Sequence, residues 1–387
     1  MLLFNDNIKE SSTLKINALA NQKKKNGEKI YNFSVGEPLI DNNASIVSGV
    51  IKALESKRAA YPPPVGLSEL VDPSVEWMNK TYNCEYTAKE AMITCGGKYG
   101  LSLALQAILD PGDEVIIISP FWVSYPEMIK IFGGSTKIYR TKEENDWQVD
   151  ADELGKLITE KTKAIILNNA SNPTGHLFSR EELRAVLKLA HDNDIFVISD
   201  EVYSGLVYDD NIFVSSGEFP EFKDKVIIIQ SCSKNFGMTG WRVGMVFAPQ
   251  EVIQCLSTLQ SQSITNTSIV SQWAAIEALH KAEEINDGVR KIMQARRDCF
   301  VQNFNTLFPN KINAPKSSLY CFVKLTNLGI NEKDAGEYAM ELMEKANIAV
   351  TPGNSFGEDG YVRFSFGISE DEIRDGLKSL KKYISLS

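Results

Sequence analysis

The chain has 387 residues, of which 43% are hydrophobic and 24% are charged, and its formal net charge is -9. This usage is typical of a globular protein, and the length suits two domains or one large domain with a smaller lobe. The acidic balance argues against sequence-independent nucleic-acid binding, which needs a basic surface. No apolar run approaches the length of a membrane span, and the N-terminus lacks the basic and apolar regions of a signal peptide.

Six cysteines are scattered along the chain without a CxxC pair, and only three histidines occur. This spacing indicates neither a disulfide framework nor a metal site, and it favours a reducing compartment. We therefore expect a cytoplasmic protein that has no metal, no membrane association and no nucleic-acid partner.

Short apolar runs alternate with helical patterns between about residues 90 and 250. In this region Ser179 and Glu182 form a capping box, which predicts a helix that ends near Asn193. Strands this apolar, alternating with helices, predict a mostly parallel sheet that is covered on both faces. The expected strands are Ala91–Thr94, Glu114–Ser119, Lys163–Asn168, Ile195–Ser199, Val226–Gln230 and Val243–Phe247.

The pattern changes after about Pro249, where two long helical stretches cover roughly residues 250–281 and 283–307. A smaller α+β region follows and predicts a second lobe. Its expected elements are a strand at Tyr320–Leu325, a helix near 333–346, a strand at Tyr361–Phe366 and a capped helix from Ser369 to the end.

The most specific pattern is SCSKNFGMTGWRVG at residues 231–244, directly after an expected strand. Small residues around Lys234 leave room for a flat ring. Partial desolvation lowers the pKa of such a lysine and makes its amine a nucleophile or a base. Lys234 alone could be an ordinary surface lysine, but the whole pattern, with Arg242 eight residues on, argues against that interpretation.

This stretch resembles the lysine signature of the class I/II aminotransferases, a family of pyridoxal-phosphate enzymes. The similarity runs from about Ser11 to the last helix, with the motifs in the same order. It implies the α/β architecture of fold type I, with a mostly parallel seven-stranded sheet between helices in a large domain and a smaller α+β lobe. It places the large cofactor-binding domain at 46–282 and the small domain at 1–45 and 283–387.

The resemblance also implies pyridoxal 5'-phosphate as the cofactor. Lys234 would form the covalent link to it and carry the substrate proton, and Arg242 and Ser231 would bind its phosphate, with Ser233 as a further candidate. Gly97 and Lys98 stand between an expected strand and helix, where backbone N–H groups can reach a phosphate. The family holds the cofactor phosphate at this turn, although a glycine pair alone is an ordinary turn.

Asp200 and Tyr203 follow an expected strand in the motif SDEVY. A fixed carboxylate keeps a pyridinium nitrogen protonated, and Asp200 is placed to supply it. Alone, Asp200 could cap a helix, Tyr203 could pack in the core, and the NPTG sequence that begins at Asn172 could be a plain turn. The resemblance implies Asp200 on the ring nitrogen, Tyr203 and Asn172 on the ring oxygen, and Trp122 stacked on the ring face.

Arg363 lies in an otherwise apolar strand, where an arginine needs a partner. Its planar guanidinium group can donate two parallel hydrogen bonds to a carboxylate, although a structural ion pair is the ordinary alternative. The resemblance implies that Arg363 binds the substrate α-carboxylate. By the same resemblance Tyr61 reaches the cofactor phosphate of a neighbouring subunit, which implies a homodimer with shared sites. The remaining residues that it places at the substrate are Gly36, Trp122, Asn172, Lys98, Ser11 and Thr13.

The relatives that the chain resembles most are bacterial aspartate aminotransferases, in which a lysine at the position of Lys98 reads the distal carboxylate. A cation there would favour dicarboxylates. The expected reaction therefore converts aspartate and 2-oxoglutarate to oxaloacetate and glutamate by a ping-pong mechanism. Aromatic amino acids or prephenate as substrates, or a β-lyase reaction on the same scaffold, remain open. A transcription regulator would need a DNA-binding module ahead of motifs that begin within the first 40 or so residues.

Overall fold

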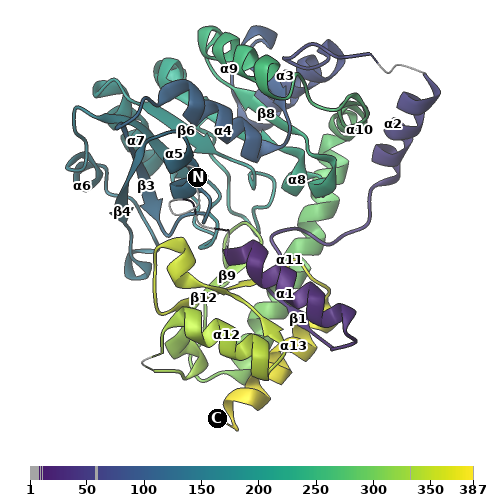
Figure 1. Cartoon of the computed structure of the whole chain (residues 1–387), viewed down its shortest axis with the longest axis vertical. Coiled ribbons are helices and arrows are strands. Elements are labelled where there is room, and N and C mark those ends of the chain that lie inside the picture. The colour runs from purple at the N-terminus through teal and green to yellow at the C-terminus, as the bar shows by residue number, and fades with distance from the viewer. Residues whose placement is uncertain (1–7, 9, 11, 57–59, 332, 387) are drawn as a thin grey trace, which may run out of the picture.

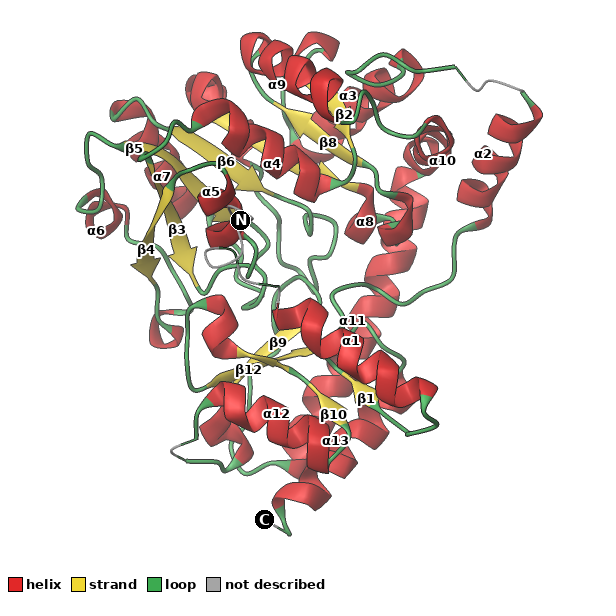
Figure 2. Cartoon of the chain, viewed as in Figure 1, coloured by secondary structure: helices red, strands yellow, loops and turns green. Residues whose placement is uncertain are grey.

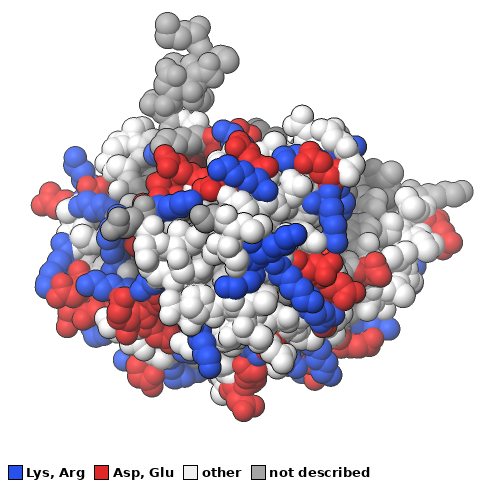
Figure 3. Space-filling model, turned by 90° about the horizontal axis from the view of Figure 1, so that it is seen from below, with Lys and Arg blue, Asp and Glu red and all other residues white. Residues whose placement is uncertain are grey.

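The structure is a computed structural model that describes residues 8, 10, 12–56, 60–331 and 333–386. Figure 1 shows a larger lobe built around one sheet and a smaller lobe below it, with the long helix α11 (Ala282–Leu307) running between them. Figure 2 shows helices on both faces of the large sheet. On the face seen in Figure 3, basic and acidic side chains are mixed. No helix in the described part of the chain is long and apolar enough to span a bilayer.

The large sheet has seven strands in the order β2-β8-β7-β6-β5-β3-β4. Among the described strands of this sheet, β8 alone runs against the others. The mostly parallel sheet predicted from the sequence is therefore confirmed. Its strands are β2 (Ala91–Thr94), β3 (Glu114–Ser119), β4 (Ser135–Arg140), β5 (Thr162–Asn168), β6 (Phe196–Asp200), β7 (Val226–Ser231) and β8 (Gly244–Phe247).

Alternate side chains of each buried strand enter two separate cores. On β3, Ile116 belongs to one core, whereas Val115 and Ile117 belong to the other. This alternation is the period of a strand that is covered on both faces. The core around Ile117 is closed by α4 (Gly97–Ile108), α5 (Tyr125–Ile131) and α9 (Gln250–Ser263). The core around Ile116 is closed by α3 (Ser68–Tyr82), α7 (Arg180–Asp192), α10 (Ile269–His280) and α11.

The smaller lobe combines the C-terminal part of the chain with an N-terminal segment. Its sheet is antiparallel in the order β11-β12-β9, and a separate parallel pair joins β1 to β10. The domain boundaries at 45/46 and 282/283 stay a prediction. The elements are α1 (Ser12–Lys25), β1 (Tyr31–Asn32), β9 (Tyr320–Lys324), α12 (Ala335–Lys345), β10 (Ile348–Ala349), β11 (Thr351–Pro352), β12 (Tyr361–Ser365) and α13 (Glu370–Ile384). The remaining α-helices are α2 (Ala44–Glu55), α6 (Ala151–Gly155) and α8 (Cys232–Asn235).

Two expectations differ from the structure. The sequence predicts one continuous helix over 250–281. This prediction is wrong, because α9 ends at Ser263 and α10 begins at Ile269. Thr265, between them, has a φ of 68°, which a continuous α-helix does not permit. Strand β4 was not located from the sequence. It is an edge strand in which no residue is buried, so it lacks the apolar run that identified the central strands.

Candidate active site

Three neighbouring parallel strands of the large sheet each end in a polar residue, and these residues line one cavity. Strands β5, β6 and β7 end at Asn168, Asp200 and Ser231, and all three residues line a cavity of about 480 Å³. In open α/β sheets ligands bind outside the carboxyl ends of the strands, and this cavity lies there. Tyr320 and Arg363 of the smaller lobe complete its lining. The site is therefore built between the two lobes.

The cavity brings together every residue that the sequence proposed for the site except Tyr61 and Ser11. Tyr61 is 86% exposed and lies apart from the cavity of its own chain. That position agrees with the expectation that it serves a neighbouring subunit, which stays a prediction. Ser11 lies outside the described residues, whereas Thr13, expected beside it, lines the cavity.

Lys234 reaches the cavity from α8, a single helical turn that follows β7 directly. Ser231 caps this turn, because its hydroxyl accepts a hydrogen bond from the Ser233 amide at 3.1 Å. The Lys234 amine donates to the Gly36 carbonyl of the N-terminal segment. Burial lowers the pKa of Lys234 to about 8; the charge of Glu37 opposes this shift, and the charges of Arg242 and Arg363 add to it. The lowered pKa brings the amine closer to the neutral form that a proton carrier needs.

Asp200 is buried at the end of β6. Burial raises the pKa of its carboxyl to about 6, although a hydrogen bond from Tyr125 opposes the rise. Tyr125 donates to Oδ2 of Asp200 at 2.6 Å. The sequence did not single out Tyr125, because it lies 75 residues away on α5 and has no motif around it.

Tyr203 and Tyr320 meet inside the cavity, and both side chains are buried. Their hydroxyl oxygens are 2.8 Å apart. Tyr203 comes from the turn after β6, and Tyr320 opens β9 of the smaller lobe. The sequence proposed Tyr203 but gave Tyr320 no role, since a tyrosine at the start of an apolar strand is usually core.

One end of the cavity is suited to a phosphate. The N-terminus of α4 begins at Gly97, and Ser231, Ser233 and Arg242 also line this region. A Cβ at Gly96, whose φ is 80°, would collide with the guanidinium of Arg242. Glycine is therefore required for the arginine to approach the backbone N–H groups at the start of the helix.

Arg363 is 1% exposed, in the middle of β12. Its two terminal nitrogens donate to Asn172 Oδ1 at 3.0 Å, to the Ser34 carbonyl at 3.2 Å and to Thr351 Oγ1 at 3.3 Å. Its Nε has no hydrogen-bond partner among the described residues. These partners are neutral, so the buried cation lacks a counter-charge among them and can take an incoming carboxylate.

Lys98 and Trp122 line the same cavity. The Lys98 amine lies 4.9 Å from the centre of the Trp122 ring and donates to Ser124 Oγ at 3.1 Å. The protein packed around its stem, together with the charge of Arg242, lowers the pKa of Lys98. Trp122 also packs edge-to-face on Tyr125, with ring centres 5.5 Å apart.

The arrangement fits a flat, phosphate-bearing aldehyde cofactor. Anion donors at the start of α4, the buried carboxylate of Asp200, the amine of Lys234 and the buried Arg363 all line one cavity, and the Nε of Arg363 has no hydrogen-bond partner among the described residues. The buried Asp200 suits a protonated ring nitrogen, and the amine of Lys234 is within the same cavity.

Comparison with known proteins agrees with this geometry. Residues 28–380 match the family "Aminotransferase class I and II". The chain is 35% identical to a probable aspartate/prephenate aminotransferase of Aquifex aeolicus, over 97% of this chain and 96% of that protein. It is 33% identical to an aspartate/prephenate aminotransferase of Thermus thermophilus, over 97% of each. The structure of the Thermus thermophilus aspartate aminotransferase with maleate superposes with a TM-score of 0.92 at 33% identity, covering 97% of each chain.

The chain therefore belongs to the class I and II aminotransferases, which depend on pyridoxal 5'-phosphate. Its fold is that of fold type I, as the sequence predicted. It is an enzyme that transfers amino groups between amino acids and 2-oxo acids.

Proposed function

We propose that the residues gathered in the cavity act in the roles that the sequence suggested. The α4 N-terminus at Gly97, with Ser231, Ser233 and Arg242, holds the cofactor phosphate. Asp200 holds a proton on the ring nitrogen. Tyr203 and Asn172 bind the ring oxygen, and Trp122 covers one ring face. These assignments are supported by the common lining of the cavity and by the buried, charge-bearing Asp200.

Pyridoxal phosphate supplies an electron sink for the bond that breaks at the substrate Cα. Lys234 is the group that moves the proton, because its amine opens onto the cavity and its lowered pKa leaves it able to accept one. Arg363 binds the substrate α-carboxylate and thereby orients the Cα–H bond.

We further propose that the enzyme exchanges amino groups between aspartate and 2-oxoglutarate, giving oxaloacetate and glutamate in two half-reactions. The observation that carries this proposal is that the cavity holds two cations, Arg363 and Lys98, besides Lys234 and Arg242, which the proposed roles assign to the cofactor. Two cations on one pocket match a substrate with two carboxylates. The relatives named aspartate aminotransferase and the neighbour solved with maleate, a dicarboxylate, give further support.

Lys98→Met tests the dicarboxylate role, since it keeps the length of the side chain and removes its charge. We expect kcat/KM for aspartate to fall about 100-fold, or about 3 kcal/mol for one charged contact, while kcat/KM for alanine changes little. Lys161→Met is the matched control, because Lys161 is exposed and lies just before β5, whose other end at Asn168 lines the cavity. An equal loss for aspartate and alanine would show that Lys98 does not read the distal carboxylate.

A second candidate acceptor is prephenate, because two of the relatives are named aspartate/prephenate aminotransferases. An assay that contains aspartate as donor together with both 2-oxoglutarate and prephenate measures which of the two acceptors the enzyme prefers. Release of pyruvate and ammonia from a cysteine-type substrate would instead indicate a β-lyase.

We also propose that the chain works as a homodimer with shared active sites. Tyr61, predicted to serve the neighbouring subunit, is 86% exposed in the single chain. Helix α2 carries Val47, Ile51 and Leu54 at helical spacing, and they are 41%, 50% and 65% exposed. An exposed apolar stripe of this kind is typical of a surface that another chain covers.

Ile51→Asp tests the dimer, because a carboxylate placed in an apolar contact opposes association. Sedimentation should give twice the chain mass for the native protein and a larger share of single chains for the variant. Ile212→Asp changes an isoleucine that is 80% exposed elsewhere, and it should leave the mass unchanged. A native protein that sediments as a single chain would contradict the proposal.

A further inference from the structure

Tyr320 occupies a position in the site that the proposed roles leave unexplained. It is the first residue of β9, it is 1% exposed, and its side chain lines the cavity. Its hydroxyl also lies near Gly36, since a Cβ built at that glycine would be 3.5 Å from it. Gly36 in turn accepts the hydrogen bond from the Lys234 amine.

Two contacts connect Tyr320 to residues with proposed roles. Its hydroxyl is 2.8 Å from the hydroxyl of Tyr203, and the two rings meet edge-to-face with centres 5.9 Å apart. The face of its ring lies under Arg363, with the guanidinium carbon 4.1 Å from the ring centre. A ring face attracts a cation at this distance, so the phenol ring supports the buried arginine.

Counting protons fixes the direction of the hydrogen bond between the two tyrosines. Each hydroxyl has one proton to donate and can accept from another donor. If Tyr203 gives its proton to the ring oxygen of the cofactor, it has none left for Tyr320. The 2.8 Å contact then requires Tyr320 to donate and Tyr203 to accept.

We propose that Tyr320 is a positioning residue that donates to the Tyr203 hydroxyl and so directs the proton of Tyr203 at the cofactor's ring oxygen. A hydroxyl that accepts a hydrogen bond becomes a stronger donor, because the chain of hydrogen bonds polarises. The proposal rests on the role proposed for Tyr203. It is independent of which amino acid is the substrate.

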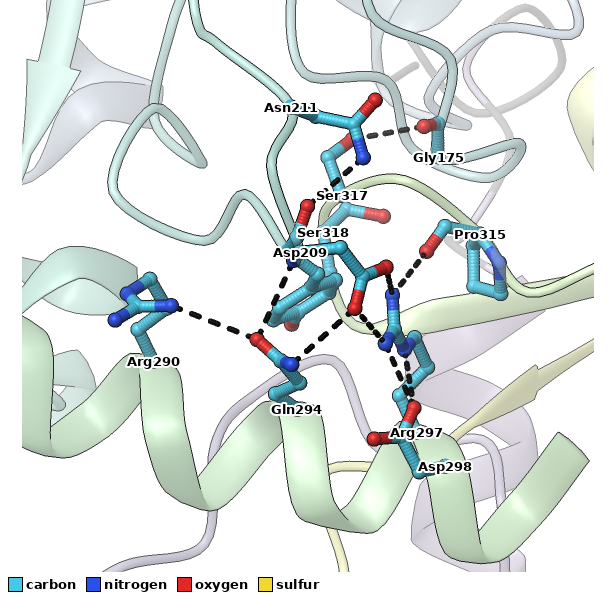
Figure 4. Close-up of polar contacts among 11 residues, drawn as sticks. Gly175, Asp209, Asn211, Arg290, Gln294, Arg297, Asp298, Pro315, Ser317 and Ser318 are labelled. Carbon is cyan, nitrogen blue, oxygen red and sulfur yellow. Dashed lines mark hydrogen bonds and ion pairs between the residues drawn. The ribbon is translucent and has the colours of Figure 1, made fainter. Parts of the chain in front are cut away.

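The backbone that leads into Tyr320 is fixed to the large lobe. Ser318 donates its amide to the Leu206 carbonyl at 2.9 Å, and Ser317 Oγ donates to the Gly175 carbonyl at 2.8 Å. Tyr208 donates to the Ser318 carbonyl. Figure 4 shows the Ser317 side chain pointing to Gly175 of the large lobe. These hydrogen bonds fix the segment just before Tyr320 to the region around the turn that carries Tyr203. The two hydroxyls are thereby kept within hydrogen-bond distance of each other.

Arg297 holds the same segment from α11. Its guanidinium binds both carboxylate oxygens of Asp209, at 2.7 and 2.8 Å, and donates to the Pro315 carbonyl at 3.2 Å. Figure 4 shows these contacts converging on Arg297. The side chain is 3% exposed although Asp209 is half exposed. This clamp links α11, the loop after Tyr203 and the start of β9.

The test uses the pH titration of the visible absorption band of the cofactor-loaded protein, without any amino acid present. Tyr320→Phe keeps the ring beneath Arg363 and removes only the hydroxyl. A weaker donor at Tyr203 leaves the cofactor oxygen more easily protonated, so the midpoint should move to higher pH. We expect a rise of roughly half a pH unit, smaller than the rise caused by Tyr203→Phe.

The double variant Tyr203→Phe/Tyr320→Phe decides whether Tyr320 acts through Tyr203. We expect its midpoint to equal that of Tyr203→Phe alone. Shifts that simply add would show that Tyr320 acts independently and would overturn the proposal. No shift in Tyr320→Phe alongside a clear shift in Tyr203→Phe would overturn it as well, and so would no shift in Tyr203→Phe.

Tyr338→Phe is the matched control. Tyr338 is also 1% exposed, but it lies on α12, and its hydroxyl has no hydrogen-bond partner among the described residues. Its removal should leave the titration unchanged. Because no substrate is added, a wrong assignment of aspartate as donor would not alter this result, and the two proposals fail separately. A second readout is the KM for the amino acid, which should stay within about twofold in Tyr320→Phe because Arg363 keeps its ring.

Discussion

Tyr125 donates a hydrogen bond to Asp200, with 2.6 Å between the phenol oxygen and Oδ2. The acceptor ends β6 and the donor begins α5, so the contact joins the sheet to one of the helices that cover it. Asp200 loses its hydration on burial, and this hydrogen bond replaces part of it. The hydrogen bond thereby favours the charged form of the carboxyl, which the role proposed for Asp200 requires.

Tyr125→Phe should therefore weaken cofactor binding. A hydrogen bond to a charged group contributes about 1.5–3 kcal/mol, so the dissociation constant of pyridoxal phosphate should rise roughly 10- to 100-fold. Titration of the apoprotein with the cofactor, followed by absorbance, measures this change. Tyr86→Phe is the control, since Tyr86 is buried and its hydroxyl has no hydrogen-bond partner within the described residues. Equal affinities for the Tyr125 variant and the native chain would contradict the role.

The stability of the apoprotein should depend on the protonation of Asp200. Burial raises its pKa from 3.8 to about 6, so the folded protein binds this proton more tightly than the unfolded chain does. The contribution of Asp200 to stability is therefore most favourable below about pH 4 and declines as the pH rises to about 6. Two pKa units correspond to about 3 kcal/mol.

Asp200→Asn should remove this dependence. The amide oxygen can still accept from Tyr125, and no buried charge forms, so the variant apoprotein should be more stable than the native one at pH 8. The two should converge near pH 4. Urea unfolding at both pH values measures the difference. The same variant should lose nearly all transamination, because an amide does not hold the ring nitrogen protonated. A native apoprotein that stays the more stable at pH 8 would contradict the assignment.

Much of the fold and the site follows from local patterns. The central strands were found because both of their faces are buried, and the 231–244 motif located Lys234 and Arg242 within one loop. Tyr125 and Tyr320 were missed for the opposite reason. Each sits in an ordinary apolar setting, and only the folded chain brings it to Asp200 or Tyr203. Such pairings depend on tertiary contacts between distant segments, which no short pattern encodes.

Arg363→Lys should impair the binding of both substrates. Lysine keeps the charge but loses the planar fork, so one of two parallel hydrogen bonds to the α-carboxylate is lost. We expect KM to rise about 10- to 100-fold for the amino acid and for the oxo acid alike. Arg180→Lys, an exposed arginine paired with Glu218, serves as the control in steady-state assays. A rise for only one of the two substrates would contradict a shared α-carboxylate site.

The Arg297–Asp209 clamp should contribute to stability. Arg297→Met keeps the buried stem but removes the bonds to Asp209 and Pro315. Because Asp209 is half exposed, water compensates part of the loss, and we expect about 1–3 kcal/mol of destabilisation. Thermal unfolding of the apoprotein measures it. Arg374→Met, which removes an exposed pair with Asp371, should change the melting temperature little. An unchanged melting temperature for the Arg297 variant would show that the clamp is dispensable.

The most direct test of the central claim is the absorbance spectrum of the purified, cofactor-loaded protein during a single half-reaction. Aspartate added alone should shift the visible band to the shorter wavelength of the aminated cofactor, and 2-oxoglutarate added next should restore it. That reversible change would establish the cofactor, the transfer and the dicarboxylate substrates together. A band that responds to other amino acids and ignores aspartate would contradict the substrate assignment, and a protein that forms no band with pyridoxal phosphate would contradict the site itself.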